Sequence, residues 1–136
     1  MVQPKKKIET LINNFKLKKN IKILPFQNNP YPFIKKSQLF ILSSRYEGLP
    51  NSLLEAIVLN IPVISSDCPS GPSEILDKCK GGLLFTIGDY KSLANKIEYF
   101  IKSKNQMMQK KKYARKRLNR FDYKLRLHDY YKAICS

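Results

Sequence analysis

Apolar residues recur with helical spacing near the start of the chain and in continuous runs further along it. The first set, at positions i, i+3, i+4 and i+7, comprises Ile8, Leu11, Ile12 and Phe15. This stripe predicts an amphipathic helix over about residues 4–18. Residues 21–24 then indicate a short strand that Pro25 stops. Residues 26–37 are expected to form a loop that ends in about one helical turn.

Three later runs are apolar without alternation, which is typical of strands buried on both faces of a sheet. They occupy residues 38–42, 62–66 and 82–85. Helical segments separate them, so the order is that of βαβ units. We therefore expect an α/β fold, a Rossmann-like parallel sheet flanked by helices on both faces.

The helices between and after these strands can be placed by their caps and apolar stripes. One is expected from about Asn51 or Ser52 to Leu59, and a short one over residues 73–76. Asp89 is the expected N-cap of a third helix, whose stripe is Leu93, Ile97 and Phe100 or Ile101. The remaining chain is basic helical sequence with the apolar anchors Leu118, Phe121, Leu125, Tyr130, Tyr131 and Ile134.

Length and composition fit one globular domain. The chain has 136 residues and 15.9 kDa, with 43% hydrophobic and 26% charged residues, which excludes a disordered or collagen-like chain. Its longest apolar runs, residues 39–42 and 56–59, are far shorter than the ~20 residues of a membrane span. We therefore expect no segment that crosses a bilayer.

The formal charge of +16 is carried by the two ends of the chain. Residues 1–24 hold seven Lys against Glu9, residues 25–101 are neutral, and residues 102–136 hold twelve basic residues against two Asp. Such ends suit nucleic acid, an anionic lipid surface or plain solvation. The aromatics among them, Tyr113, Phe121, Tyr123, Tyr130 and Tyr131, suit base stacking or, as we favour, packing on the sheet. Charge alone leaves the partner open.

Cysteine and histidine offer little for a metal or disulfide site. Cys68, Cys79 and Cys135 are an odd number without CxxC spacing, and His128 is the single histidine. We expect neither a disulfide framework nor a zinc site, and we expect His128 to be structural or exposed. The basic start has no apolar segment behind it, so no secretory signal is indicated and the cytoplasm is the expected compartment.

Candidate chemistry lies where the strand at 38–42 leads through a loop into the next helix. Ligands of open α/β sheets bind at this edge, and the first amides of a helix can receive a phosphate. Gly48 would let the backbone approach a ligand, and the amides near Asn51 and Ser52 would face it. Glu47 and Glu55 flank this place, and carboxylates accept the paired hydroxyls of sugars. Taken alone, both glutamates also suit plain roles, as a loop carboxylate and a residue favoured by the helix dipole.

The sequence around Glu47 and Glu55 resembles that of a known family. It reads Ser44-Arg45-Tyr46-Glu47-Gly48-Leu49-Pro50-Asn51-Ser52-Leu53-Leu54-Glu55-Ala56, followed by residues 62–67, 71–75, 82–85 and 88–89. Over residues 5–101 it resembles the C-terminal half of family 4 glycosyltransferases. The resemblance implies a GT-B enzyme, with two Rossmann-like domains, a nucleotide-sugar donor, retention at the anomeric carbon and no required metal or other cofactor.

The resemblance also assigns roles to individual residues. Glu47 would be the catalytic carboxylate that contacts the donor sugar, and Glu55 would hold the ribose. Gly48 and the amides of Leu49, Asn51 and Ser52 would take the pyrophosphate. Gly71, Pro72 and Glu74 match a loop near the donor. The Ser-Arg-Tyr-Glu-Gly string is similar to enzymes of lipid-linked or lipopolysaccharide glycan synthesis, which suggests a UDP-sugar donor and a glycan or lipid-linked acceptor.

The chain departs from that family in length. Family members are typically more than twice as long. The N-terminal domain, the first strand of the C-terminal domain and a basic Arg and Lys pair that follows it in the family have no counterpart here. We expect a partial donor-binding domain over 1–101 and a basic helical segment over 102–136 that packs back on it. We expect such a chain to be inactive alone and to bind a separately encoded N-terminal half or a second copy of itself. The alternatives are a non-catalytic remnant or a basic module on anionic membrane or, less favoured, nucleic acid.

Overall fold

The computed structural model describes residues 4–122, and the chain divides into two compact units after Pro30. The first unit holds α1, Pro4–Asn14, on which Ile12 is buried at 9% exposure while Ile8 and Leu11 are about half exposed. The predicted helix is confirmed, but it ends four residues early. Lys16 takes a left-handed φ of 56°, and the amides of Lys16 and Leu17 bond to the carbonyls of Asn13 and Ile12. This pairing is a Schellman C-cap, which stops the helix.

The predicted strand at residues 21–24 is wrong. This segment has no regular secondary structure, and Ile21, Ile23 and Leu24 are between 36% and 43% exposed. A three-residue apolar pattern forms a strand only when a neighbouring strand accepts its backbone bonds, and the first unit contains none among its described residues.

The sheet of the second unit has three parallel strands in the order β1-β2-β3. They are β1, Phe40–Leu42, β2, Val63–Ser66, and β3, Leu83–Phe85, shorter than the predicted runs but in the same places. Ile64 of β2 is the Cα partner of Ile41 on one side and Leu83 on the other. The central β2 is buried throughout, as predicted. The edge strand β1 is not, because Ile41 remains 37% exposed.

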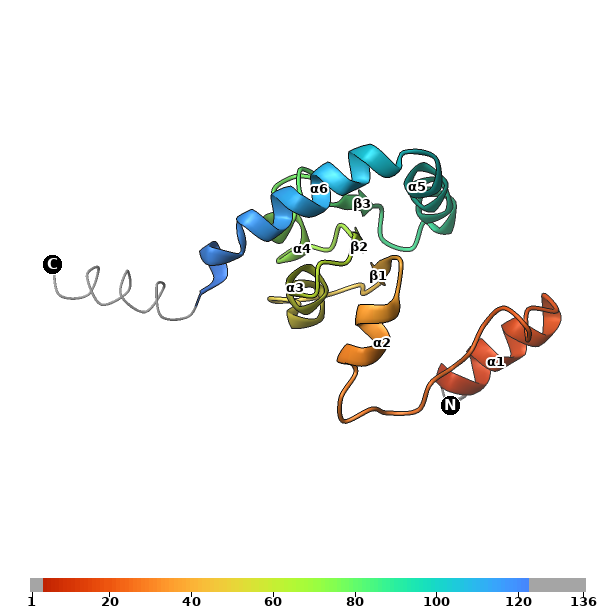
Figure 1. Ribbon diagram of the computed structural model, residues 1–136. Helices are drawn as coiled ribbons and strands as arrows, with labels where there is room; N and C mark the ends of the chain where they lie inside the picture. Colours follow the sequence, from red (N-terminus) through yellow and green to blue (C-terminus); the bar gives the residue numbers. More distant parts are fainter. Residues whose placement is uncertain (1–3, 123–136) are drawn as a thin grey trace, which may run out of the picture. The chain divides into compact units, whose positions relative to one another are not determined.

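Helices cover both faces of this sheet (Figure 1). On one face, Val63 and Leu42 pack in one cluster with Leu53 of α3, Asn51–Val58. On the other, Ile64 and Leu83 form a second cluster, against which α5, Tyr90–Lys102, packs with Leu93, Ile97 and Phe100. Each fully buried aliphatic side chain contributes about 1.5–3 kcal/mol relative to an exposed one. The predicted α/β fold with a flanked parallel sheet is confirmed.

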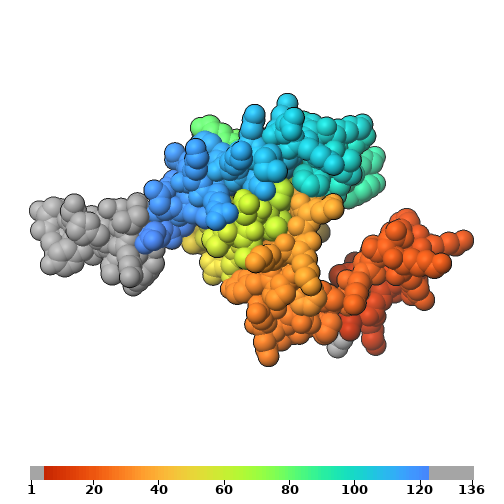
Figure 2. Space-filling view, in the orientation of Figure 1, coloured from red at the N-terminus to blue at the C-terminus, as the bar shows by residue number. Residues whose placement is uncertain are grey.

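Helix α6, Lys104–Lys116, belongs to both layers. Its Ala114 joins the first cluster and its Met107 joins the second. Figure 2 shows it running over the surface of the second unit. The expected boundary between a donor-binding domain and a basic helical segment at residue 101 stays a prediction. The two compact units of the structure divide after Pro30. Leu118 and Phe121, in the short helix Leu118–Phe121, pack on the core, and the anchors expected beyond residue 122 lie outside the described residues, as do His128 and Cys135.

Short elements complete the second unit. Helix α2, Tyr31–Lys36, is the predicted turn before β1, and α4, Pro72–Ile75, is the predicted short helix. Asp89 caps α5 as predicted, because its side chain accepts a hydrogen bond of 2.9 Å from the amide of Ser92.

Cys68 and Cys79 are free thiols. Within the described residues, no helix has the length and apolar character that a membrane span requires.

Candidate functional site

Two loops meet at the carboxyl edge of the sheet, where β1 and β2 end. The hydroxyl of the buried Ser66 donates to the carbonyl of Ser44 over 2.6 Å, which ties the end of β2 to the end of β1. The hydroxyl of Ser70 donates to the carbonyl of Glu47, again over 2.6 Å. The loop before α3 is therefore held in place by the loop before α4.

Two glycines lie at the point where these loops touch. Gly71 has a φ of +88°, and a β-carbon there would lie 2.2 Å from the carbonyl oxygen of Gly48 and 2.6 Å from Cδ of Pro50. Any other residue would collide with backbone, so glycine is required at 71. A β-carbon at Gly48 would meet nothing within 4 Å. The space beside Gly48 is therefore open, and no packing within this chain explains a glycine there.

Helix α3 begins three residues after Gly48. Its N-cap is Pro50, which supplies no side-chain acceptor. Pro50 accepts from the amides of Leu53 and Leu54, whereas no hydrogen bond is formed by the amides of Leu49, Asn51 and Ser52 within the described part of the chain. Free amides at the positive end of a helix favour an anion. These three amides are thus free to receive an anion, and their role in binding a diphosphate stays a prediction.

The two candidate carboxylates precede and follow that helix end along the chain, and both are partly buried. Glu47 precedes α3 in the loop, and Glu55 follows Asn51 by one turn on the side of α3 away from the buried Leu53 and Ala56. Oε1 of Glu55 accepts a hydrogen bond of 3.3 Å from the hydroxyl of Tyr31. The pairing with Tyr31 was not predicted, because twenty-four residues of chain separate the partners and no spacing rule links them.

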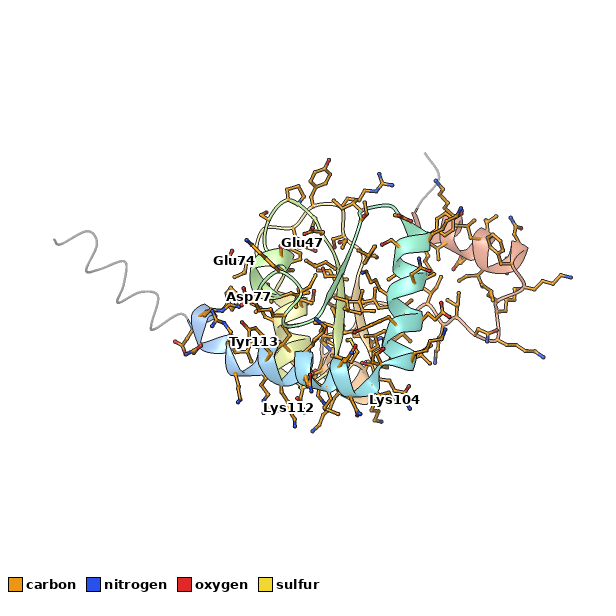
Figure 3. All side chains as sticks on the ribbon, turned by 90° about the horizontal axis from the view of Figure 1, so that it is seen from above. Glu47, Glu74, Asp77, Lys104, Lys112 and Tyr113 are labelled. Atoms are coloured by element: carbon orange, nitrogen blue, oxygen red, sulfur yellow. The ribbon has the colours of Figure 1, made fainter. Side chains whose placement is uncertain are left out.

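Gly71, Pro72 and Glu74, which were expected to form a loop near the donor, differ in how exposed they are. Gly71 and Pro72 are buried, and Pro72 is among the least exposed side chains, so they shape the loop from inside. Glu74 is exposed on α4, and Figure 3 shows its label beside that of Glu47 on one side of the unit. Of these three residues, only Glu74 offers a side chain to a ligand.

Tyr113 of α6 and Arg117, which follows α6, hold the turn after α4 through Asp77. These contacts were not predicted from the sequence. Asp77 accepts a hydrogen bond from the hydroxyl of Tyr113 and lies 3.5 Å from Nζ of Lys80 and 3.9 Å from Nε of Arg117. The hydrogen bond from Tyr113, followed by the two cations, holds the pKa of Asp77 below its ordinary value. Asp77, Lys78 and Cys79 all take a left-handed φ, between 47° and 73°. The chain after α4 is thus tightly bent and pinned to α6.

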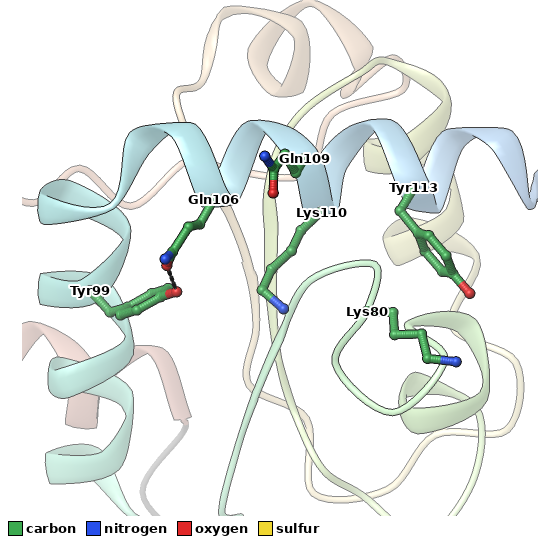
Figure 4. A pocket seen from close by; sticks show the side chains of 6 residues that line it. All are labelled: Lys80, Tyr99, Gln106, Gln109, Lys110 and Tyr113. Atoms are coloured by element: carbon green, nitrogen blue, oxygen red, sulfur yellow. Dashed lines mark hydrogen bonds between the residues drawn. The ribbon is translucent and has the colours of Figure 1, made fainter.

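A hollow of about 500 Å³ lies next to these contacts (Figure 4). Its lining residues are Lys80, Tyr99, Gln106, Gln109, Lys110 and Tyr113. Most of their polar groups are already paired: Lys110 donates to the carbonyl of Cys79, and the hydroxyl of Tyr99 donates to Gln106. Within residues 4–122 no three His, Cys, Asp or Glu side chains gather as metal ligands would.

This sheet edge, with two loops converging on an open helix N-terminus, is accompanied by a family match over most of the chain. The family described as glycosyl transferases group 1 matches residues 3–117. The chain belongs to the group 1 glycosyltransferases. The resemblance to glycosyltransferases is thereby confirmed at this level, whereas membership of family 4 stays a prediction.

Individual relatives are also glycosyltransferases. An uncharacterized glycosyltransferase of Methanocaldococcus jannaschii is 51% identical over 72 residues, which is 53% of this chain and 18% of that protein. A Campylobacter jejuni enzyme, N-acetylgalactosamine-N,N'-diacetylbacillosaminyl-diphospho-undecaprenol 4-alpha-N-acetylgalactosaminyltransferase, is 27% identical over 87% of this chain and 32% of its own length. A lipopolysaccharide 1,6-galactosyltransferase of Escherichia coli is 38% identical over 50% of this chain and 19% of its own. The chain thus spans a fifth to a third of these relatives.

Solved structures confirm the GT-B type of fold. Anabaena Alr3699/HepE, solved in complex with UDP, has a TM-score of 0.86 at 21% identity, over 96% of this chain and 36% of that one. TarM has a TM-score of 0.85 at 23% identity, over 99% of this chain and 27% of that one. At these identities the likeness concerns the fold alone.

Proposed function

We propose that this domain binds the nucleotide-sugar donor of a retaining glycosyltransferase at the carboxyl edge of its sheet. The observation that carries the proposal is the N-terminus of α3, where the amides of Leu49, Asn51 and Ser52 are unbonded and a partly buried carboxylate precedes and follows them in the sequence. A diphosphate on these amides would place one end of the donor toward Glu47 and the other toward Glu55. The open space beside Gly48 leaves room for the phosphates.

Each carboxylate then has its own task. Glu55, held by Tyr31, would accept hydrogen bonds from the two ribose hydroxyls. Glu47, in the loop before α3, would contact the transferred sugar and act as the catalytic carboxylate. Glu74 reaches the same side of the unit from α4 and would touch the sugar or its phosphate environment (Figure 3). The helix N-terminus would stabilise the charge that develops on the departing diphosphate, so we propose that no metal is needed.

A UDP-sugar is the proposed donor, and a glycan or lipid-linked glycan is the proposed acceptor. The relatives support this choice: one is named for a diphospho-undecaprenol substrate, another for lipopolysaccharide, and a structure of the same fold contains UDP. Because the matched region is a fifth to a third of those enzymes, the acceptor half of the site would come from protein outside these residues. We propose that residues 4–122 bind donor and turn over only with that half.

Calorimetry with UDP tests the donor site. The full chain should bind UDP, with and without chelator, and Glu55→Ala should weaken binding at least ten-fold. Glu98→Ala is the matched control, because Glu98 is an exposed carboxylate of α5 paired with Lys102. No binding at millimolar UDP, or equal loss in both variants, would overturn the proposal.

A further inference from the structure

Helix α6 turns its charges away from the sheet. Residues 104–116 contain six basic residues and no acidic one. Met107 and Ala114 are buried against the sheet layers, while Lys104, Lys112, Arg115 and Lys116 are exposed. None of these four cations forms an ion pair with any described residue. Their field therefore acts on the solvent, without compensation from the protein.

An apolar groove of about 480 Å³ adjoins these charges. It lies where α5 passes into α6, beside the residues that precede β1 and β2. Ile101 and Met108 line it and are 60% and 46% exposed, and Lys104 and Lys111 line it as well. The other lining residues are uncharged. We call Ile101, Lys104, Met108, Lys111, Lys112 and Arg115 the basic apolar face.

The basic apolar face is on the far side of the unit from the candidate donor site. Figure 3 shows the labelled Lys104 and Lys112 on the α6 side, opposite Glu47 and Glu74. Lys104, Met108, Lys111 and Arg115 follow one another at spacings of four, three and four residues, which places them along one stripe of the helix. A flat partner could thus touch all of them at once and leave the donor edge open.

We infer that the basic apolar face binds the surface of an anionic membrane. Aliphatic side chains among lysines suit the boundary between headgroups and acyl chains, where apolar atoms leave water and ammonium groups meet phosphates. Nucleic acid fits less well, because bases stack on exposed aromatic rings, whereas the aromatic ring that lines the groove, Phe100, packs against the core and the exposed apolar side chains are Ile101 and Met108. The inference stands on α6 and its groove, independently of the donor proposal.

Vesicle sedimentation of the full chain tests this inference. At 0.1 M salt the chain should bind vesicles of equal parts phosphatidylglycerol and phosphatidylcholine and ignore pure phosphatidylcholine. The variant Lys104→Gln, Lys112→Gln, Arg115→Gln should bind about a hundred-fold more weakly, at about five-fold for each lost charge. The matched control removes as many charges from exposed positions in the first unit: Lys18→Gln, Lys19→Gln, Lys22→Gln.

Two further arms separate the surface from net charge and from other polyanions. The variant Ile101→Ser, Met108→Ser keeps every charge and should still lose several-fold in affinity, because less apolar area is buried. Equal loss in the two triple variants would overturn the inference, since the effect would then follow total charge. So would retention on a mixed-sequence DNA duplex without vesicle binding. All variants concern exposed side chains, and an unchanged circular dichroism spectrum and melting temperature verify their fold.

Discussion

The hydroxyl of Tyr31 donates a hydrogen bond to Oε1 of Glu55 across 3.3 Å and so joins the first helix of the second unit to the helix at the candidate site. Glu55 lies on the solvent side of α3, and among residues 4–122 no second hydrogen bond or ion pair reaches its carboxylate. Tyr31 therefore fixes the position of the carboxylate that we propose binds the donor.

Tyr31→Phe should weaken UDP binding about two- to ten-fold, because one hydrogen bond to a charged group is lost at an exposed site. The melting temperature should hardly move. Tyr90→Phe is the control, since Tyr90 is 74% exposed at the start of α5. Unchanged UDP affinity in Tyr31→Phe would show that Glu55 needs no positioning or does not touch the ligand.

The two glycines of the site should respond in opposite ways to alanine. Gly71→Ala should destabilise the fold by about 3 kcal/mol or more, because the new β-carbon meets the carbonyl of Gly48 and the φ is strained. Gly48→Ala should leave stability nearly unchanged and weaken UDP binding about ten-fold by filling the open space. Urea unfolding and calorimetry on both variants separate the effects, and a destabilised Gly48→Ala would contradict this geometry.

Asp77 should make stability depend on acid pH. Its pKa is lowered in the folded state, first by the hydrogen bond from Tyr113. The stabilisation is therefore present above the unfolded pKa and lost as pH falls through the folded value, in the range below the ordinary carboxyl pKa of 3.8. Urea midpoints across that range should fall more steeply for the unmodified chain than for Asp77→Asn. Asp67→Asn, at an exposed loop carboxylate, should keep the steep profile.

Two adjacent methionines of α6 should differ sharply in their effect on stability. Met107 is 2% exposed and packs with Ile64 and Leu83, so Met107→Ala should cost about 2–5 kcal/mol. Met108 is 46% exposed, and Met108→Ala should cost less than about 0.5 kcal/mol. Urea denaturation of both variants gives the difference. Similar costs would mean that α6 does not sit on the sheet as described.

The sheet was predictable because its strands are short apolar runs between capped helices. Asp89 indicated the start of α5 because its side chain caps the helix, and the βαβ order predicted parallel pairing of the strands. The failures have local causes. Residues 21–24 carry a strand-like composition with no neighbouring strand, and Lys16 ends α1 through a backbone conformation that composition does not encode.

The candidate site was predictable only in part for a related reason. Glu47, Asn51 and Glu55 lie within one strand, loop and helix, so their spacing in sequence carries over to space. The partners that hold the site come from afar: Tyr31 is twenty-four residues from Glu55, and Tyr113 is thirty-six from Asp77. Such pairs depend on how helices stack, which no local pattern records.

The three left-handed residues after α4 lower the stability of the fold, so a substitution there could raise it. Each non-glycine residue in that conformation costs about 1–2 kcal/mol, and Asp77, Lys78 and Cys79 bear it in succession. Asp77 is committed to Tyr113, but Lys78 is exposed and bonded only through its backbone. An engineer seeking a hardier variant would begin with Lys78→Gly, where removing one side chain would relax the bend and leave every other interaction in place.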